Sequence, residues 1–217
     1  MKSVPPSKGL LITFEGNEGS GKSTQIKLLY EYLKKRRIPV FLTREPGGTK
    51  IGDEIRGILL DACNKKMSAE TETLLYMASR AQLVEEVILP RLKEGKIVLC
   101  DRWLDATEAY QGYGARVDIQ WIRLLGRVAT KGIKPKLTIF FDLPLATGLR
   151  RAKSHKAADR MEQKEFLFHQ RVRKGYLSIA KNEPRRFKII AIKESDAIPA
   201  VREKVKKIIQ NVLFRNR

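Results

Sequence analysis

The chain has 217 residues, of which 42% are apolar and 31% are charged. This length and composition fit one globular domain spanning 1–217 and argue against a disordered or low-complexity chain. No apolar run approaches the about 18 residues of a membrane span, and the N-terminal segment lacks the apolar core of a secretion signal. Cys63 and Cys100 show no metal-site spacing, so we expect a reduced, cytoplasmic protein.

The charge is strongly basic: 44 Lys and Arg against 24 Asp and Glu give a formal net charge of +20. Residues 150–217 contain 20 of these basic residues and only 7 acidic ones. Such a charge suits either a nucleic-acid surface or small anionic substrates. The basic residues are scattered and accompany no zinc-finger, RNP or heptad pattern, so nucleic acid is the less favoured partner.

Strands and helices are predicted to alternate along the chain. Short, nearly continuous apolar runs predict buried parallel strands at 9–15, 39–45, 96–101, 136–142 and 186–192. Apolar residues at helical spacing predict helices at 23–35, 69–93, 118–129 and 199–214. This alternation predicts an α/β three-layer domain, in which a five-stranded parallel sheet carries helices on both faces. Residues 150–173 are basic and helical without a clean apolar stripe, which suggests a mobile flap.

A phosphate-binding loop follows the first predicted strand. The sequence GNEGSGKS at 16–23 fits the pattern G-x-x-x-x-G-K-[ST], between a strand and a helix as that pattern requires. Glycines let backbone N–H groups turn toward a phosphate, and the start of a helix adds partial positive charge. Lys22 is expected to reach the β- and γ-phosphates, and Ser23 is expected to bind Mg²⁺. The alternative, a glycine-rich turn without function, is disfavoured by this context.

A second apolar strand, KIVLCD, ends in Asp101. A carboxylate at this position resembles a Walker-B aspartate, which lies beside the metal ion in P-loop proteins. Many buried strands end in Asp, so the signal is weak alone and gains weight from the phosphate loop. Together the two segments predict a nucleoside triphosphate site with Mg²⁺.

Six motifs in one order and spacing resemble the thymidylate kinase family of P-loop nucleoside-monophosphate kinases. They are FEGNEGSGKSTQ, TREPGGT, SRAQ, DRW, AYQG and DRME, and the resemblance runs from about residue 9 to about residue 192. It implies that the chain uses ATP and Mg²⁺ to phosphorylate dTMP to dTDP, in dTTP biosynthesis, as a homodimer. It also implies that the loop residues hold ATP; they are Gly16, Asn17, Glu18, Gly19, Ser20, Gly21, Lys22, Ser23 and Thr24.

The resemblance also implies which residues meet the phosphates and the sugar. Glu18 corresponds to a carboxylate near the 3′-hydroxyl of the acceptor, and Arg44 to an arginine that grips the dTMP phosphate with two parallel hydrogen bonds. Arg102 corresponds to an arginine that bridges the donor and acceptor phosphates during transfer. From the residues alone, Glu18 and Arg44 could be solvated charges, and Arg102 could simply pair with Asp101 or Glu45.

The base site is implied by residues on two segments. Tyr76 and Arg80 lie four residues apart and therefore share one helix face. The resemblance implies that Tyr76 stacks on thymine, that Arg80 binds its O4 atom, and that Thr107 reads the base edge. Tyr110 is implied to exclude a ribose 2′-hydroxyl, with Gln111 hydrogen-bonded nearby. On spacing alone, Tyr76 would be a core residue and Arg80 a solvated charge.

A lid near 150–162 is implied to close over ATP. The phosphate loop has no arginine, so the lid is expected to supply the catalytic cation. Arg150, Arg151 and Arg160 are the candidates, with Lys153 and His155 close by. We expect the catalytic set to comprise Glu18, Lys22, Arg102, Arg151 and Arg160, with Ser23 and Asp101 at the metal. Ordinary solvated helix charges are the alternative for each lid residue.

Three other functions remain open from sequence. The first is a kinase for another acceptor, such as dUMP, dCMP or a deoxynucleoside, which the base-site residues would distinguish. The second is a P-loop ATPase that binds nucleic acid through the +20 charge. The third is a binding module without activity, against which Lys22, Ser23, Asp101 and Arg102 argue.

Overall fold

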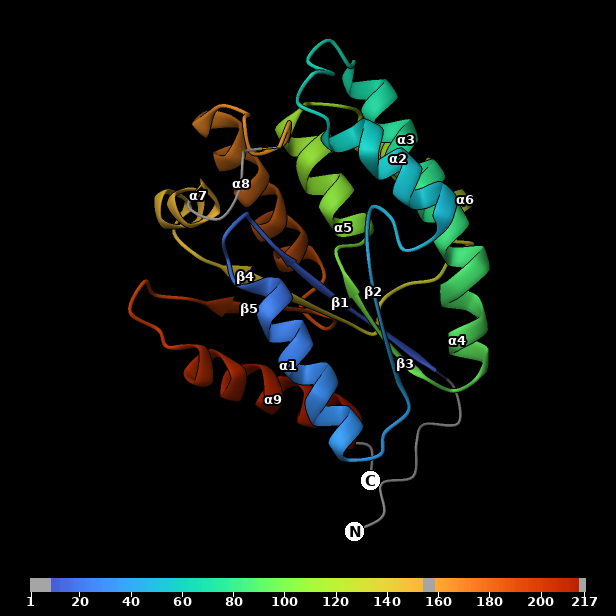
Figure 1. The fold of residues 1–217 in the computed structure, drawn as a ribbon. Helices are drawn as coiled ribbons and strands as arrows, with labels where there is room; N and C mark the ends of the chain where they lie inside the picture. The colour runs from blue at the N-terminus through green and yellow to red at the C-terminus, as the bar shows by residue number, and fades with distance from the viewer. Residues whose placement is uncertain (1–8, 154–158, 215–217) are drawn as a thin grey trace.

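A five-stranded parallel sheet forms the centre of the molecule (Figure 1). The computed structural model describes residues 9–153 and 159–214. The strand order is β2-β3-β1-β4-β5, and every neighbouring pair is parallel. The strands are β1 (Leu10–Gly16), β2 (Val40–Arg44), β3 (Ile97–Asp101), β4 (Leu137–Asp142) and β5 (Phe187–Ala191). The predicted α/β fold with a five-stranded parallel sheet is therefore confirmed.

Helices connect the strands and cover both faces of the sheet. They are α1 (Lys22–Lys35), α2 (Lys50–Leu60), α3 (Ala69–Leu83), α4 (Leu89–Lys93), α5 (Leu104–Thr107), α6 (Ile119–Ala129), α7 (Leu145–Lys153), α8 (Phe166–Asn182) and α9 (Ile198–Phe214). Two π-helical segments, Val84–Ile88 and Glu108–Gly114, follow α3 and α5. The predicted helix at 69–93 is thus α3, a π-helical turn and α4 in succession. None of the described helices has the length and apolar character required to cross a membrane.

Two apolar layers hold the helices against the sheet. Helices α1 and α9 lie side by side on one face, where Leu29, Leu33, Val205 and Ile209 are buried against the strands (Figure 1). On the other face, α8 and the π-helical segment 108–114 pack on β4 and β5, and α3 with its π-helical turn packs on β3. Because the central strands are covered on both faces, most of their residues are apolar.

Side-chain caps fix where helices α2 and α3 begin. The Thr49 side chain accepts from Gly52 N at 3.0 Å at the start of α2, and the Ser68 side chain accepts from Thr71 N at 3.1 Å at the start of α3. These caps satisfy N–H groups that the first turn of a helix leaves open. Helix α1 differs, because its N-cap is Gly21, which supplies no side-chain acceptor. The first N–H groups of α1 are therefore available to a ligand.

Candidate active site

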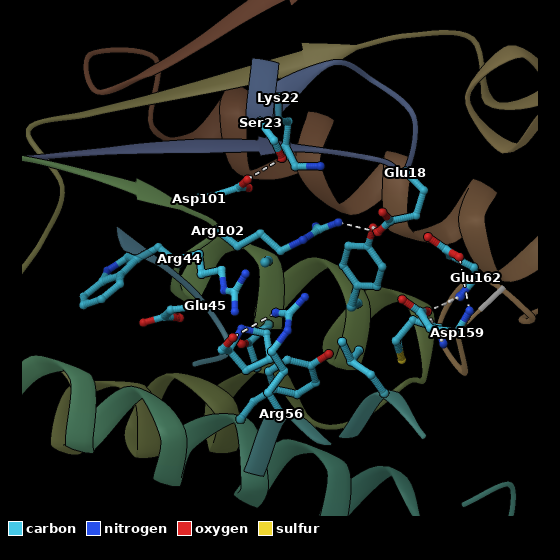
Figure 2. A pocket seen from close by; sticks show the side chains of 18 of the residues that line it. Glu18, Lys22, Ser23, Arg44, Glu45, Arg56, Asp101, Arg102, Asp159 and Glu162 are labelled. Atoms are coloured by element: carbon cyan, nitrogen blue, oxygen red, sulfur yellow. Dashed lines mark hydrogen bonds and ion pairs between the residues drawn. The ribbon is translucent and has the colours of Figure 1, made fainter. Parts of the chain in front are cut away.

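A cavity of about 450 Å³ opens at the carboxyl ends of β1, β2 and β3 (Figure 2). In parallel α/β sheets, ligands bind at this end of the strands. The walls come from the phosphate loop, the segment after β2, helices α2 and α3, the segment after β3, and α7. Of the residues expected from sequence, the cavity brings together Glu18, Lys22, Ser23, Arg44, Tyr76, Arg80, Asp101, Arg102, Thr107, Tyr110, Gln111 and Arg151.

The phosphate loop has the conformation and the open polar groups that an anion requires. Gly19 lies in the left-handed region with φ +68°, and helix α7 approaches it so closely that an added Cβ would lie 2.1 Å from the Gly148 carbonyl oxygen. The Asn17 amide and the Ser20 hydroxyl are buried and have no hydrogen-bond partner among the described residues. Buried polar groups are normally paired, so these groups fit a bound phosphate chain.

Lys22 lies within this loop and is buried. Its Nζ donates to the Asn17 carbonyl oxygen at 3.5 Å, which is a long contact and leaves the ammonium able to turn to a phosphate. Burial lowers the pKa of Lys22, as does the charge of Arg102, whereas the carboxylates of Glu18 and Asp101 oppose this. A bound polyphosphate would add negative charge here and favour the protonated form of Lys22.

Ser23 and Asp101 meet at the start of α1. The Ser23 hydroxyl donates to Asp101 Oδ2 at 2.7 Å (Figure 2). A hydroxyl and a carboxylate are both oxygen ligands of the kind that Mg²⁺ takes, with phosphate and water oxygens completing its shell. No cluster of three or more His, Cys, Asp or Glu side chains that could hold a metal occurs among the described residues. Thr24, the next residue, is exposed.

Arg102 reaches across the cavity to Glu18, with which it forms an ion pair (Figure 2). The Tyr110 hydroxyl donates to the same Glu18 oxygen at 3.2 Å. Burial alone would raise the pKa of Glu18, but the charges of Arg102 and Lys22 outweigh it and lower the pKa to about 2. Glu18 is therefore a carboxylate at neutral pH. In this structure it binds Arg102, the arginine that the resemblance implies to contact the phosphates.

Glu15, which is not among the expected site residues, binds two neighbours of Arg102. Glu15 accepts from the Trp103 backbone N–H and from the Tyr176 hydroxyl. Burial and the nearby Asp105 raise the pKa of Glu15 to about 8, although Arg102 and the two hydrogen bonds oppose the shift. The sequence signal that could have pointed to Glu15 is a carboxylate within a mostly apolar strand.

Two arginines converge where the TREPGGT segment leaves β2. The Arg44 side chain is 59% exposed and lies 3.6 Å from Asp53, so it has little to hold it in the absence of a ligand. Arg56 of α2 donates to the Pro46 carbonyl oxygen at 2.9 Å and lines the same cavity. Burial lowers the pKa of Arg56, and the charges of Arg44 and Arg102 lower it further. Sequence reasoning missed Arg56 because α2 was not predicted.

Arg80 is a buried part of the cavity wall and not a solvated charge. Its Nε donates to Glu45 Oε2 at 2.8 Å, and its Nη2 donates to Thr107 Oγ1 at 3.0 Å. Burial raises the pKa of Glu45, and Arg80 opposes this. Tyr76, one turn before Arg80 on α3, lines the cavity and is half-buried. Residues from the segment after β2, from α3 and from α5 thus meet at one end of the cavity.

Gln111 and Arg160 are joined through Glu72 of α3. The Gln111 side-chain amide donates to Glu72 Oε1 at 2.6 Å, and Arg160 Nη1 lies 2.5 Å from Glu72 Oε2. Arg160 Nε also donates to the Leu59 carbonyl oxygen at 2.8 Å. Arg160 is buried against α2 and α3 and does not line the cavity. In this structure the Arg160 guanidinium is therefore bound to Glu72 and does not line the cavity.

The other lid residues differ in position. Arg150 forms an ion pair with Glu194 and is largely exposed. Arg151 lines the cavity and donates to the Glu194 carbonyl oxygen at 3.1 Å. Helix α7 ends at Lys153, and His155 lies outside the described residues. Of the three arginine candidates for the lid cation, Arg151 alone lines the cavity.

Known proteins resemble the chain over most of its length. The family model for thymidylate kinase matches residues 14–205. A thymidylate kinase of Geotalea daltonii is 53% identical over 189 residues, covering 84% of this chain and 88% of its own. One of Roseiflexus castenholzii is 46% identical over 217 residues, covering 94% of each chain. The crystal structure of thymidylate kinase from Ehrlichia chaffeensis superposes with a TM-score of 0.75 at 35% identity, covering 94% of this chain and 99% of that one.

Proposed function

The chain belongs to the thymidylate kinase family and phosphorylates dTMP with ATP, and on this premise we propose that the transfer takes place in the cavity of Figure 2. The observation that carries the proposal is the ion pair of Glu18 and Arg102, which spans the cavity beside Lys22. ATP phosphates lie in the loop at the start of α1, where open N–H groups, Asn17 and Ser20 receive them. The dTMP phosphate lies on the opposite side, at Arg44 and Arg56.

Catalysis by this chain consists mainly of positioning and charge neutralisation. Lys22 holds the donor phosphates, and Arg102 leaves Glu18 to contact the phosphoryl group in transfer. Glu18 then accepts a hydrogen bond from the acceptor 3′-hydroxyl and orients the sugar. Ser23 and Asp101 would hold Mg²⁺, which would supply positive charge to the donor phosphate oxygens. Donor groups arranged beforehand in this way act on charge as it develops.

The other end of the cavity selects the base. Tyr76 stacks on thymine, and Arg80, oriented by Glu45 and Thr107, donates to its O4 atom. Tyr110 fills the space beside C2′ and keeps out a ribose hydroxyl. A site with polar groups fixed in this way discriminates strongly, because a wrong base leaves them without partners.

The lid closes the phosphate side through α7, the helix that carries Arg151. Arg151 is the lid residue best placed to add a cation to the donor phosphates, since it lines the cavity. Closing this side excludes water and limits idle hydrolysis of ATP. Arg160 stabilises the far end of the lid, near 150–162, through Glu72 and Leu59.

The protein acts as a cytoplasmic homodimer of single-domain chains. Support for the dimer comes from large apolar side chains exposed on α2, α3 and α6, which lie on the same side of the molecule (Figure 1). They are Ile51, Ile58, Leu74, Leu124 and Val128, each about half exposed or more. Large apolar side chains exposed on neighbouring helices are typical of an interface between subunits.

A coupled assay of ADP formation tests the proposal. Purified protein is mixed with ATP and Mg²⁺ and with each nucleoside monophosphate in turn, and double-stranded DNA is added separately. We expect turnover with dTMP, slower turnover with dUMP and little with the thymine ribonucleotide. ATP hydrolysis stimulated by DNA, with no turnover of any monophosphate, would contradict the assignment.

A further inference from the structure

We propose that Glu15 is a positioning residue for Arg102: it holds the backbone next to Arg102 directly and its guanidinium through Tyr176. The inference rests on the proposed role of Arg102 in phosphoryl transfer. Glu15 itself does not line the cavity, so it acts on the reaction only through other groups. Glu15 lies near the end of β1, and it follows Phe14, which pairs with Asp101, the last residue of β3.

Hydrogen bonds to β1 hold the backbone in place beyond the end of β3. The last paired residues of the two strands are Phe14 and Asp101, and Arg102 N then donates to the Phe14 carbonyl oxygen at 3.0 Å. The next N–H, that of Trp103, donates at 2.8 Å to the side chain of Glu15 instead of to the backbone. Trp103 is 1% exposed, so this N–H has no access to water. Glu15 thus fixes the chain on the C-terminal side of Arg102.

Arg102 needs such support because of its own conformation. Its φ is +73°, in the left-handed region that non-glycine residues seldom adopt. Residues keep such a conformation only where the surroundings hold them in it, and they are concentrated at functional sites. The hydrogen bonds at Arg102 N and Trp103 N lie on either side of the φ and ψ angles concerned. Together they determine the direction in which the Arg102 side chain leaves the backbone.

A second contact reaches the guanidinium. Arg102 Nη1 donates to the Tyr176 hydroxyl at 3.4 Å, and that hydroxyl donates to Glu15 Oε2 at 2.9 Å. Tyr176 is fully buried and stacks on Phe140 with ring centroids 4.7 Å apart, so its hydroxyl has little freedom. The guanidinium is therefore held at one side by Tyr176 and at the other by Glu18.

A simpler explanation is that Glu15 only satisfies buried polar groups and stabilises the fold. The two explanations differ in one respect. If Glu15 acts through Arg102, its replacement should cost nothing further once Arg102 is gone, because contributions of coupled residues are not additive. A purely structural role would lower activity by the same factor with or without Arg102.

The test is a double-mutant cycle with E15Q, Y176F, R102A and E15Q/R102A. The side-chain amide in E15Q keeps an oxygen for the Trp103 N–H, so the buried backbone group stays paired and the chain should still fold. Its nitrogen cannot accept from the Tyr176 hydroxyl, so that contact is lost. At pH 9, above the Glu15 pKa of about 8, where the carboxylate can accept from both partners, we expect E15Q and Y176F each to lower kcat about tenfold or more, since slight misplacement of a charge-stabilising group is costly. The KM for ATP should stay within about twofold. E15Q/R102A should match R102A, and an equal loss by E15Q in both backgrounds would overturn the proposal.

A second measurement does not depend on the reaction. In ¹⁵N-labelled protein, the side-chain Nε–H signal of Arg102, identified by its absence from R102K, should shift or broaden in E15Q and Y176F. E108Q is the matched control, because Glu108 is also buried and bound to an arginine, Arg123, at 2.9 Å. An unchanged Arg102 signal in E15Q would overturn the proposal. Failure of wild-type protein to phosphorylate dTMP would instead contradict the proposed function, and the signal would still report on Glu15.

Discussion

Glu72 accepts a hydrogen bond of 2.6 Å from the side-chain amide of Gln111, and both residues are buried. A carboxylate can only accept hydrogen bonds, so Gln111 presents its nitrogen to Glu72 and keeps its carbonyl oxygen for another partner. The other Glu72 oxygen is bound to Arg160. The orientation of Gln111 at the cavity is therefore set by Glu72, and an acceptor there suits a base with an N–H at its edge.

Replacing Glu72 by Gln should weaken discrimination between bases. A neutral amide at position 72 can donate as well as accept, which allows Gln111 to turn over. Thymine carries N3–H, whereas the corresponding cytosine nitrogen is an acceptor. We expect the ratio of kcat/KM for dTMP to that for dCMP to fall by about tenfold. E70Q, on the exposed side of the same helix, is the control, and equal losses with both substrates would contradict the prediction.

Arg151 and Arg150 are adjacent and should respond differently to replacement by Ala. Arg151 lines the cavity, whereas Arg150 is largely exposed and paired with Glu194. A cation that meets the transferred phosphoryl group is worth a large factor in kcat, so R151A should lose about 100-fold or more. R150A should stay within about threefold, because an exposed ion pair contributes little. Steady-state kinetics of both variants decides, and a larger loss in R150A would reverse the assignment.

Ser23→Ala should raise the Mg²⁺ concentration needed for half-maximal rate. The Ser23 hydroxyl lies 2.7 Å from Asp101, and the two together offer oxygen ligands to the metal. Loss of one group of a metal site typically weakens metal binding about tenfold or more. Titration of the rate with Mg²⁺ at fixed ATP measures the shift. An unchanged Mg²⁺ dependence would place the metal away from Ser23.

Glu15 should make the stability of the protein depend on pH. Its pKa is about 8 in the folded chain against 4.5 as the ordinary value. Between these values the folded state holds a proton that the unfolded state has released, so rising pH lowers the free energy of unfolding. In E15Q this contribution is absent. The difference in unfolding free energy, E15Q minus wild type, should therefore increase with pH by up to about 1.4 kcal/mol per unit.

Urea unfolding of both proteins across that interval of pH measures this difference. Below pH 4.5 and above pH 8 the difference should become constant, since both states of the wild type then carry the same charge at Glu15. A difference that falls as pH rises would show that the Glu15 pKa is lowered by its hydrogen bonds and by Arg102.

If the chain forms the proposed homodimer, Val128→Glu should convert it into a monomer. Val128 is 74% exposed on α6, and α6 contacts α3, which in turn contacts α2. A charge buried at a subunit interface without a partner is strongly unfavourable. Light scattering on a sizing column measures the mass. Leu167→Glu, at a 61% exposed leucine of α8, is the control and should leave the mass unchanged.

The sheet was predictable because each strand carries its own local signal. All five strands lie within one residue of the predicted ranges at both ends, because strands buried on both faces are continuous apolar runs. Helix α8 was not recognised as a separate helix. Its buried residues Phe168, Val172, Tyr176 and Ile179 have helical spacing. Two of these four residues lie beyond residue 173, so the basic segment 150–173 contains only half of this apolar stripe.

The site was predictable where a motif holds the residues close together in sequence. The phosphate loop and the Asp101–Arg102 pair are of this kind. Glu15 and Glu72 could not be found in this way, because their importance lies in partners 88 and 39 residues away along the chain. Arg160 was a candidate for the lid cation because it lies in the segment that resembles the family's lid, whereas its burial against α2 and α3 depends on tertiary packing alone.

The contact between Gly19 and Gly148 restricts how the active site can vary. A side chain at position 19 would meet the Gly148 carbonyl oxygen at 2.1 Å, and one at position 148 would meet the Glu18 carbonyl oxygen at 2.5 Å. Helix α7, which carries Arg151, therefore occupies the space into which an arginine at position 19 would grow. Grafting a cation onto the phosphate loop would require α7 to retreat, and Arg151 with it. With the loop and α7 arranged as they are, an arginine side chain at position 19 and Arg151 at its present position exclude each other.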